Sequence, residues 1–191
     1  MTEEELFHGL AEHLPPACER TYPGCNSCIL TTRIAVAVGD YFGLKIGHTA
    51  TSVICVNKPM HDRIVERGWP SSRKQTIEWC DEIGGWSCGT TGDTDTHGYG
   101  FHVVAMTPSL IGDFSVGQYS RPQYNMELLP ALVGPLYFNN HGVMVVENGL
   151  GAAIRYELRT DKEYLTTPNW AYPSRWRKLA GEMIRVLREP K

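Results

Sequence analysis

The sequence predicts an α+β fold, because helical patterns come first and strand-like runs joined by short turns follow them. It contains no strand–helix–strand alternation, which argues against a doubly wound parallel sheet. With 191 residues, 42% of them hydrophobic and 20% charged, the chain is long enough to bury one core. Since neither a repeat nor a linker is visible, we expect one domain over residues 1–191.

The N-terminal region predicts two helices separated by a turn. Residues 3–13 form the first, and Pro, Gly and Asn punctuate the turn TYPGCNS at 21–27. Asn26 or Ser27 caps the second helix, which runs to about Phe42 with Gly43 in the left-handed position after it. One face of this helix is apolar and neighbouring residues widen it, which predicts a buried central helix: Leu30, Ile34, Val38 and Tyr41, with Val36 and Ala37.

The middle of the chain predicts a strand, two short helices and a loop. The strand is GLKIGHTATSVICVN, residues 43–57, which is rich in β-branched side chains. The helices lie near 59–67 and 72–83, the latter begun by Ser71 or Ser72 and ended by Gly84-Gly85. The stretch from 86 to 100 is rich in Gly, Thr and Asp, and loops of that length are often functional.

The second half predicts two strand pairs and a closing helix. FHVVAMT and LIGDFSV are joined around Pro108-Ser109, and an irregular stretch then extends to His141. The hairpin GVMVVENGLGAAIRYEL follows, with Asn148-Gly149 at its turn. A helix from about Ser174 carries a buried stripe and a solvated basic face. The stripe comprises Trp176, Leu179, Met183 and Leu187.

Charge and hydropathy bear on partners and compartment. A net charge of −3 gives no electrostatic reason to expect nucleic acid or an anionic membrane as a partner. No apolar stretch approaches the roughly 18 residues that a spanning helix needs, and the acidic N-terminus is unlike a secretory signal. We therefore expect a cytoplasmic protein whose six cysteines are reduced thiols. The oligomeric state stays open.

Cys28, His102 and Asp113 form the candidate catalytic set. Cys28 falls in the first turn of its helix, where free N–H groups and the helix dipole favour a thiolate. Pairing Thr107 with Leu110 places Asp113 diagonal to His102 on one sheet face, within reach of a long polar side chain. A register shifted by one residue would put them on opposite faces.

This order of Cys, His and Asp resembles the transglutaminase-like branch of the papain-like cysteine enzymes, and arylamine N-acetyltransferases share it. The resemblance spans Cys28 to Asp113. It implies a buried helix with the cysteine packed on an antiparallel sheet with the histidine and aspartate. It also implies Cys28 as nucleophile, His102 as base and then acid, and Asp113 as the group that orients the imidazole. The reaction would attack an amide, ester or thioester of a peptide, protein or small-molecule substrate.

The sequence departs from these families around the cysteine. Ile29 stands where transglutaminases and papain-like proteases usually have Trp, no Gln precedes Cys28, and the RGGxC signature of the acetyltransferases is absent. An oxyanion hole would use the Cys28 backbone N–H and another donor, for which Gln118 is the candidate. Trp86 and Tyr99 are candidate apolar walls of the cleft.

Other functions remain as alternatives. Coenzyme A-dependent acyl transfer would need a basic or phosphate-binding pocket, and an inactive binding module would keep the fold without the chemistry. Cys25 and Cys28 have the spacing of a zinc or redox pair but lack a second pair, and Cys25 is the rival nucleophile. The loop residues Asp93, Asp95 and His97 with His102 are a weaker candidate metal site. We expect neither a metal nor a cofactor.

Overall fold

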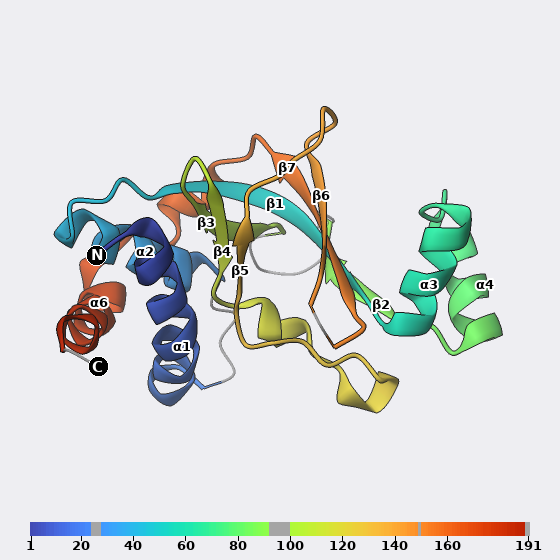
Figure 1. The fold of residues 1–191 in the computed structure, drawn as a ribbon, viewed down its shortest axis with the longest axis horizontal. Helices are drawn as coiled ribbons and strands as arrows, with labels where there is room; N and C mark the ends of the chain where they lie inside the picture. The colour runs from blue at the N-terminus through green and yellow to red at the C-terminus, as the bar shows by residue number, and fades with distance from the viewer. Residues whose placement is uncertain (24–27, 92–99, 149, 190–191) are drawn as a thin grey trace.

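The computed structural model describes residues 1–23, 28–91, 100–148 and 150–189, and confirms a mixed fold of helices and antiparallel sheet (Figure 1). The helices are α1 Glu3–Thr21, α2 Cys28–Tyr41, α3 Lys58–Arg67, α4 Arg73–Ile83, α5 Pro168–Ala171 and α6 Pro173–Arg188. The strands are β1 Gly47–Val56, β2 Ser87–Thr90, β3 His102–Met106, β4 Leu110–Asp113, β5 Leu132–Pro135, β6 Val143–Glu147 and β7 Ala153–Arg159. Three short 3₁₀ turns are η1 Val116–Tyr119, η2 Pro122–Tyr124 and η3 Glu163–Thr166.

All strands belong to one antiparallel sheet with the order β5-β4-β3-β1-β7-β6. The long strand β1 organises it. Its first half, Gly47–Thr51, pairs with β3, and its second half, from Val53 to Val56, pairs with β2 on the same edge. The opposite edge of β1 pairs with β7. One strand thus connects the part of the sheet that carries His102 with the part that carries the β6–β7 hairpin.

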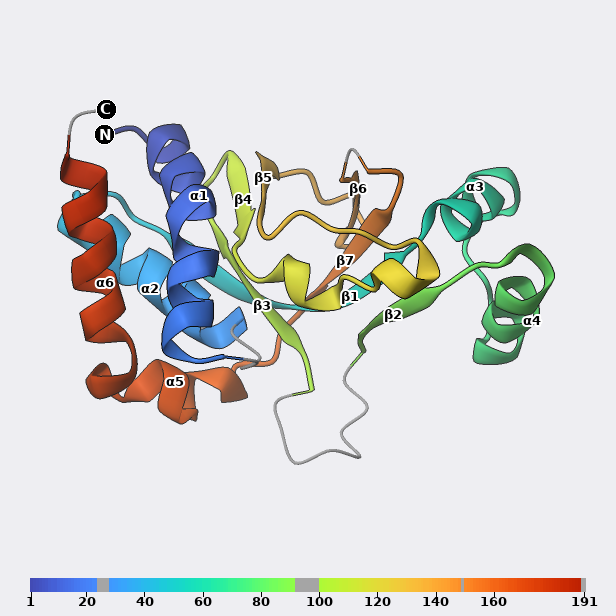
Figure 2. The same cartoon turned by 90° about the horizontal axis from the view of Figure 1, so that it is seen from below.

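Helices group at the two ends of the molecule. Figures 1 and 2 show α1, α2 and α6 at one end, together with both termini, and the α3–α4 pair at the other, beyond β2. Within the first group α2 packs against α6, α1, α5 and β3. Of its 14 residues nine are buried, which confirms a central helix. Tyr41 is an exception, since its ring is exposed and its hydroxyl accepts a hydrogen bond from Arg188.

The two faces of the sheet contribute to different cores, because side chains alternate along each strand. Val103 and Ala105 of β3 pack with the helices. Val104 of β3 packs on the other face, with Ile111 of β4 and Ile154 of β7. His102 has the parity of Val104 and therefore belongs to this second face. The alternation separates the helix-covered face from the one on which His102 lies.

The first helix is longer than predicted. It continues past residue 13 and through Pro15 and Pro16 to Thr21, although each proline removes a backbone donor. Burial explains the extension, because Leu14, Ala17 and Cys18 continue the apolar stripe of the first turns into the core. The two prolines interrupt the helical pattern of the sequence, but they do not interrupt the packing of this helix against the core.

Two predicted loops contain strands. Ser87–Thr90, predicted as part of a loop, forms β2 against β1, and Leu132–Pro135, in the stretch predicted as irregular, forms β5 against β4. Both strands have four residues, so neither has enough alternation to be recognised from sequence. The other predicted strands and helices are present within a few residues, and the basic face of α6 is exposed as predicted.

Two predicted caps and turns fall outside the described residues. They are the predicted caps of α2, Asn26 and Ser27, and the second residue of the predicted hairpin turn, Gly149. Gly43 adopts the predicted left-handed conformation with φ of 73°, and Gly84, at the predicted end of α4, is also left-handed with φ of 66°.

Candidate active site

His102 and Asp113 form a buried, hydrogen-bonded pair. The predicted register is confirmed, since Met106 pairs with Ile111 and Ala105 with Gly112. This register puts both side chains on one face, and His102 Nε2 lies 2.8 Å from Asp113 Oδ2. Both side chains are completely buried. β4 ends at Asp113, so the ladder stops before the predicted pairing of His102 with Ser115.

Each oxygen of Asp113 accepts a further hydrogen bond. Tyr156 of β7, fully buried, donates its hydroxyl to Oδ2 over 2.9 Å. Ser115 donates its backbone N–H to Oδ1 over 3.1 Å and its hydroxyl to the same atom over 3.2 Å. These donors hold the carboxylate in one orientation and compensate its removal from water.

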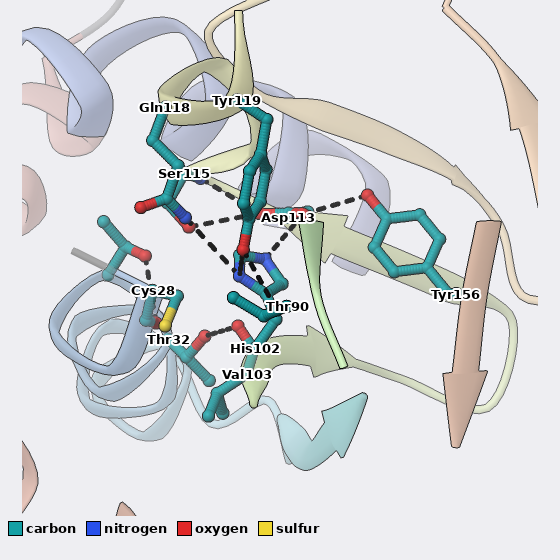
Figure 3. Close-up of polar contacts among 11 residues, drawn as sticks. Cys28, Thr32, Thr90, His102, Val103, Asp113, Ser115, Gln118, Tyr119 and Tyr156 are labelled. Carbon is teal, nitrogen blue, oxygen red and sulfur yellow. Dashed lines mark hydrogen bonds and ion pairs between the residues drawn. The ribbon is translucent and has the colours of Figure 1, made fainter. Parts of the chain in front are cut away.

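The other ring nitrogen of His102 faces a different set of groups. The Tyr119 hydroxyl lies 3.3 Å from Nδ1 and the Gln118 side-chain amide nitrogen lies 3.5 Å from it. Tyr119 is held in turn by Thr90, at the end of β2, over 3.2 Å between hydroxyls. Figure 3 shows Cys28 and Gln118 on this side of the ring, away from Tyr156.

Cys28 reaches His102 because α2 begins beside the start of β3. Thr32, one turn after Cys28, donates its hydroxyl to the carbonyl of Val103 over 3.0 Å (Figure 3). Val103 is the neighbour of His102, and this contact places the first turn of α2 over the start of β3. The Cys28 side chain lies near enough to His102 to raise the pKa of the imidazole, and it is 3% exposed. The three residues predicted to form a catalytic set therefore lie together.

The electrostatics of the pair favour its charged form. Burial has the largest single effect on the pKa of His102 and lowers it, but the charge of Asp113, then Tyr119 and the hydrogen bonds of Asp113 and Cys28 raise this pKa well above its ordinary value. Burial likewise raises the pKa of Asp113, and the His102 charge with the hydrogen bonds of His102, Ser115 and Tyr156 outweighs it, so that this pKa is lowered. An imidazolium paired with a carboxylate results.

Cys55, Cys80 and Cys88 lie in settings that differ from that of Cys28. All five cysteines of the described residues are free thiols. Burial raises the pKa of Cys55, Cys80 and Cys88, which disfavours their thiolates at neutral pH. Of the described thiols with these shifts, none is coupled to a histidine as Cys28 is. Cys25, the rival nucleophile, lies outside the described residues.

Of the two predicted cleft walls, Trp86 is not brought to His102. Trp86 stacks on Tyr124, with ring centroids 3.5 Å apart, and its backbone N–H donates to Asn57 Oδ1 over 2.9 Å. These contacts place Trp86 where α4 joins β2, at the opposite end of that strand from Thr90. Tyr99 lies outside the described residues. Among the described residues, Gln118 is the predicted ancillary residue that lies beside the candidate catalytic set.

Only some residues of the two candidate metal sites belong to the described part of the chain. Asp93, Asp95 and His97 lie outside the described residues, as does Cys25. Within the part of the chain that is described, no group of three or more His, Cys, Asp or Glu side chains is placed to hold a metal ion. In the same residues, no helix has both the length and the apolar character that crossing a membrane requires.

Three site residues were not found from the sequence. Ser115 shares the predicted strand face of Asp113, so parity offered a signal for it. Tyr119 follows Gln118 directly, and a polar aromatic beside a candidate oxyanion donor was a weaker signal. The sequence offered no signal for Tyr156, because 43 residues separate it from Asp113 and β7 lies two strands away from β4 in the sheet.

Comparison with protein families, with curated proteins and with solved structures found no match to this chain in any of the three. The site is therefore interpreted from its own geometry.

Proposed function

We propose that the protein is a cysteine hydrolase or acyltransferase that acts on an amide-type bond through a thioester on Cys28. The observation that carries the proposal is the buried His102–Asp113 pair with Cys28 at the other side of the imidazole. A nucleophile, a base and a group that orients the base are the parts that nucleophilic acyl transfer requires. Their contact supports this class of reaction over an inert core cysteine.

The residues take the following roles in the proposed reaction. The Cys28 proton is transferred to His102 before the attack, in keeping with the raised pKa of the imidazole, and the Cys28 sulfur then attacks the carbonyl carbon of the substrate as a thiolate. The imidazolium then protonates the leaving amine as the carbon–nitrogen bond breaks, which leaves an acyl thioester on Cys28. Water or a second amine, deprotonated by His102, attacks the thioester and releases the product with the thiol. Asp113 stabilises the imidazolium throughout.

Two donors are available for the developing oxyanion. The backbone N–H of Cys28 belongs to the first turn of α2, where N–H groups lack helical acceptors. Gln118 extends its side chain toward the His102 Nδ1 side. Preorganised donors of this kind contribute about 3 kcal/mol each to transition-state stabilisation in other enzymes. Gln118 is thus the proposed second oxyanion donor.

The proposal includes a fold relationship and a location. A buried helix with the cysteine at its start, beside a sheet with His and Asp on adjacent strands, is the arrangement of the papain-like and transglutaminase-like enzymes named above, and we assign the chain to that architecture. A cytoplasmic location is proposed on the sequence features alone, and free thiols among the described residues are compatible with it.

Site-resolved alkylation tests the proposal. We expect iodoacetamide to modify Cys28 rapidly below about pH 8, and His102→Ala to slow this modification at least about tenfold. Peptide mapping by mass spectrometry measures the rate at each cysteine. An activated ester should then leave a trapped acyl group on Cys28 and on no other residue, and Cys28→Ala should abolish it.

The matched control is Cys55→Ala, which removes a buried thiol that the mechanism does not use. Its alkylation profile at Cys28 should equal that of the wild type. If every thiol of the folded wild-type protein reacts slowly across pH, or if His102→Ala leaves the Cys28 rate unchanged, the enzyme proposal is wrong and the fold serves binding instead.

A further inference from the structure

Cys55 of β1 and Cys88 of β2 lie directly opposite each other on neighbouring antiparallel strands. The Cα atoms of such a pair are about 4.5–5.5 Å apart, and a disulfide spans about 4.4–6.8 Å between Cα atoms. Both residues are free thiols in this structure. The strand register therefore brings them to the separation that a disulfide needs.

The two side chains project from the same face of the sheet, because directly paired residues share a face. Cys55 and Cys88 both belong to the apolar cluster that includes Val104 and Ile111, on the face that carries His102. Burial has the largest effect on the pKa of Cys55 and raises it, and the charge of Cys88 raises it further, so the two sulfurs are close enough to interact. A bond between them requires no change in strand register.

Cys88 also contacts the chain that surrounds the imidazole. Its thiol donates a hydrogen bond to the Tyr119 carbonyl over 3.5 Å. Two residues further along β2, Thr90 lies 3.2 Å from the Tyr119 hydroxyl, which in turn lies 3.3 Å from His102 Nδ1 (Figure 3). Strand β2 thus holds Tyr119 at its backbone through Cys88 and at its side chain through Thr90.

We propose that Cys55 and Cys88 are a redox modification site, which a low-molecular-weight disulfide oxidises to an intramolecular disulfide, and that this bridge slows the candidate active site. A sulfur bonded to Cys55 carries no proton, so Cys88 no longer donates to the Tyr119 carbonyl. Of the two contacts with β2, only that of Thr90 remains. The effect on the site rests on the proposed function, because it concerns the reactivity of Cys28.

The effect is transmitted through the pKa of His102. Burial has the largest effect on this pKa and lowers it, whereas the charge of Asp113 and then Tyr119 raise it. A Tyr119 that is less firmly held raises this pKa less. His102 then takes up the proton of Cys28 less readily, and less of the reactive thiolate forms.

The oxidation consists of two thiol–disulfide exchanges. Cys88, which is partly exposed, loses its proton and attacks one sulfur of the reagent disulfide, whose S–S bond breaks to release a thiolate that takes up this proton. The Cys55 sulfur, deprotonated in turn, attacks Cys88 in the mixed disulfide and displaces the second reagent thiolate, which is protonated likewise. Two protein thiols are oxidised, and one reagent disulfide is reduced to two thiols. Because burial raises the pKa of both cysteines, the exchange is faster at higher pH.

Equilibration with mixtures of oxidised and reduced dithiothreitol at about pH 8.5 tests the site. Oxidised dithiothreitol is a cyclic disulfide, and its mixed disulfide with a single thiol such as Cys28 recloses to the ring and releases that thiol. We expect non-reducing peptide maps to show a Cys55–Cys88 bridge as the share of oxidised reagent increases. After removal of the reagent, Cys28 of the bridged protein should react with iodoacetamide about two- to tenfold more slowly, as expected for the loss of one hydrogen bond. Reduction should restore the rate.

Two variants separate the bridge from the hydrogen bond. Cys55→Ala removes the bonding partner and keeps the Cys88 donor, so its Cys28 rate should equal that of the reduced wild type in every mixture. Cys88→Ser keeps a donor for the Tyr119 carbonyl and forms no bridge, so its rate should not respond to the oxidant either. Cys80→Ala is the matched control, because Cys80 lies on α4 outside the sheet, and it should keep both the bridge and the slower rate.

If Cys55 and Cys88 of the folded wild type stay thiols in every mixture, both parts of the inference are wrong, and a rapidly reacting Cys28 still supports the proposed enzyme. A bridge that forms without changing the Cys28 rate refutes the effect on the site. A bridge that forms in a protein whose reduced Cys28 already reacts slowly supports the modification site and contradicts the enzyme.

Discussion

Asp113 accepts two hydrogen bonds on each carboxylate oxygen, from His102 and Tyr156 on one and from Ser115 twice on the other. A carboxylate that leaves water loses its hydration, and this number of donors replaces it. The consequence for chemistry is that Asp113 stays ionised, because these donors lower its pKa against the effect of burial. The ionised carboxylate then keeps the imidazole oriented and charged.

Tyr156→Phe tests this dependence at the level of one hydroxyl. Loss of the donor removes one cause of the lowered Asp113 pKa, so this pKa rises and the carboxylate is lost at higher pH. We expect the acid limb of the Cys28 alkylation rate to move up by about one to two pH units, since a hydrogen bond to a charged group contributes about 1.5–3 kcal/mol. Rate–pH profiles of both proteins measure the shift.

Tyr164→Phe is the control for Tyr156→Phe, since it also removes a buried hydroxyl, one bonded to His48 rather than to Asp113. It should lower stability without moving the acid limb. An unchanged acid limb in Tyr156→Phe would show that Tyr156 contributes packing alone.

At the level of elements, the position of Cys28 depends on how α2 lies against β3. A helix that contacts a strand through apolar packing alone can slide along it. The Thr32 hydroxyl restricts this sliding, because it donates a hydrogen bond to the Val103 carbonyl. Gly112 contributes in the same region, because a Cβ there would lie 2.6 Å from the Phe7 ring of α1. Close packing at these two points aligns α1, α2 and the strands that carry His102 and Asp113.

Thr32→Val is the element-level test, because it keeps the shape of the side chain and removes the donor. We expect a loss of about 1 kcal/mol in the free energy of unfolding. The alkylation rate of Cys28 should fall in the fully folded protein as well, since the first turn of α2 is less well held over His102. Urea unfolding and site-resolved alkylation are the two measurements.

Thr21→Val serves as its control, because the Thr21 hydroxyl bonds only within its own helix, to the Ala17 carbonyl. Its Cys28 rate should match the wild type. If Thr32→Val changes stability without changing that rate, Thr32 is structural and does not position Cys28.

Element prediction from the sequence succeeded where a pattern was long. The strand at 43–57, the hairpin at 142–158 and the helix from Ser174 each present a periodicity that local sequence suffices to show. It was wrong for α1 beyond Pro15 and for β2 and β5. A buried face outweighs the cost of two prolines in the first case, and pairing partners stabilise four-residue strands in the others.

At the scale of the whole molecule, the sheet order determines what surrounds the ion pair. β1 is strongly curved in Figure 1, and Tyr156 of β7 contacts Asp113 of β4 although two strands lie between them in the sheet. Such a contact requires that the sheet bend toward the face that carries His102. The bend removes the pair from water, and this burial couples the stability of the fold to the protonation of the site.

The pH dependence of unfolding tests that coupling. The raised pKa of His102 adds stability that is complete below about pH 6.5 and lost as pH rises through the folded-state pKa. The lowered pKa of Asp113 adds stability that is complete above about pH 4 and lost as pH falls through its folded-state pKa. The contribution of the pair is therefore greatest between about pH 4 and 6.5.

Comparison of the wild type with a variant that lacks the pair separates the contribution of His102 and Asp113 from that of His48. Burial lowers the pKa of His48, which removes stability as pH falls below about 6.5. We therefore expect the difference in unfolding free energy between wild type and the His102→Gln, Asp113→Asn double variant to be flat from about pH 4 to 6.5 and to decrease on both sides. A difference that does not vary with pH would refute a charged buried pair.

Some features of the candidate site follow from the sequence, and others depend on the tertiary structure. The sequence by itself determined the α+β class, the register of β3 with β4 and thus the shared face of His102 and Asp113, because these follow from local periodicity and a short turn. Only the tertiary structure decided the contacts of Asp113 with Tyr156 and of Cys28 with His102. These depend on sheet order, on sheet curvature and on where α2 lies over β3, which are set by packing between segments far apart in the chain.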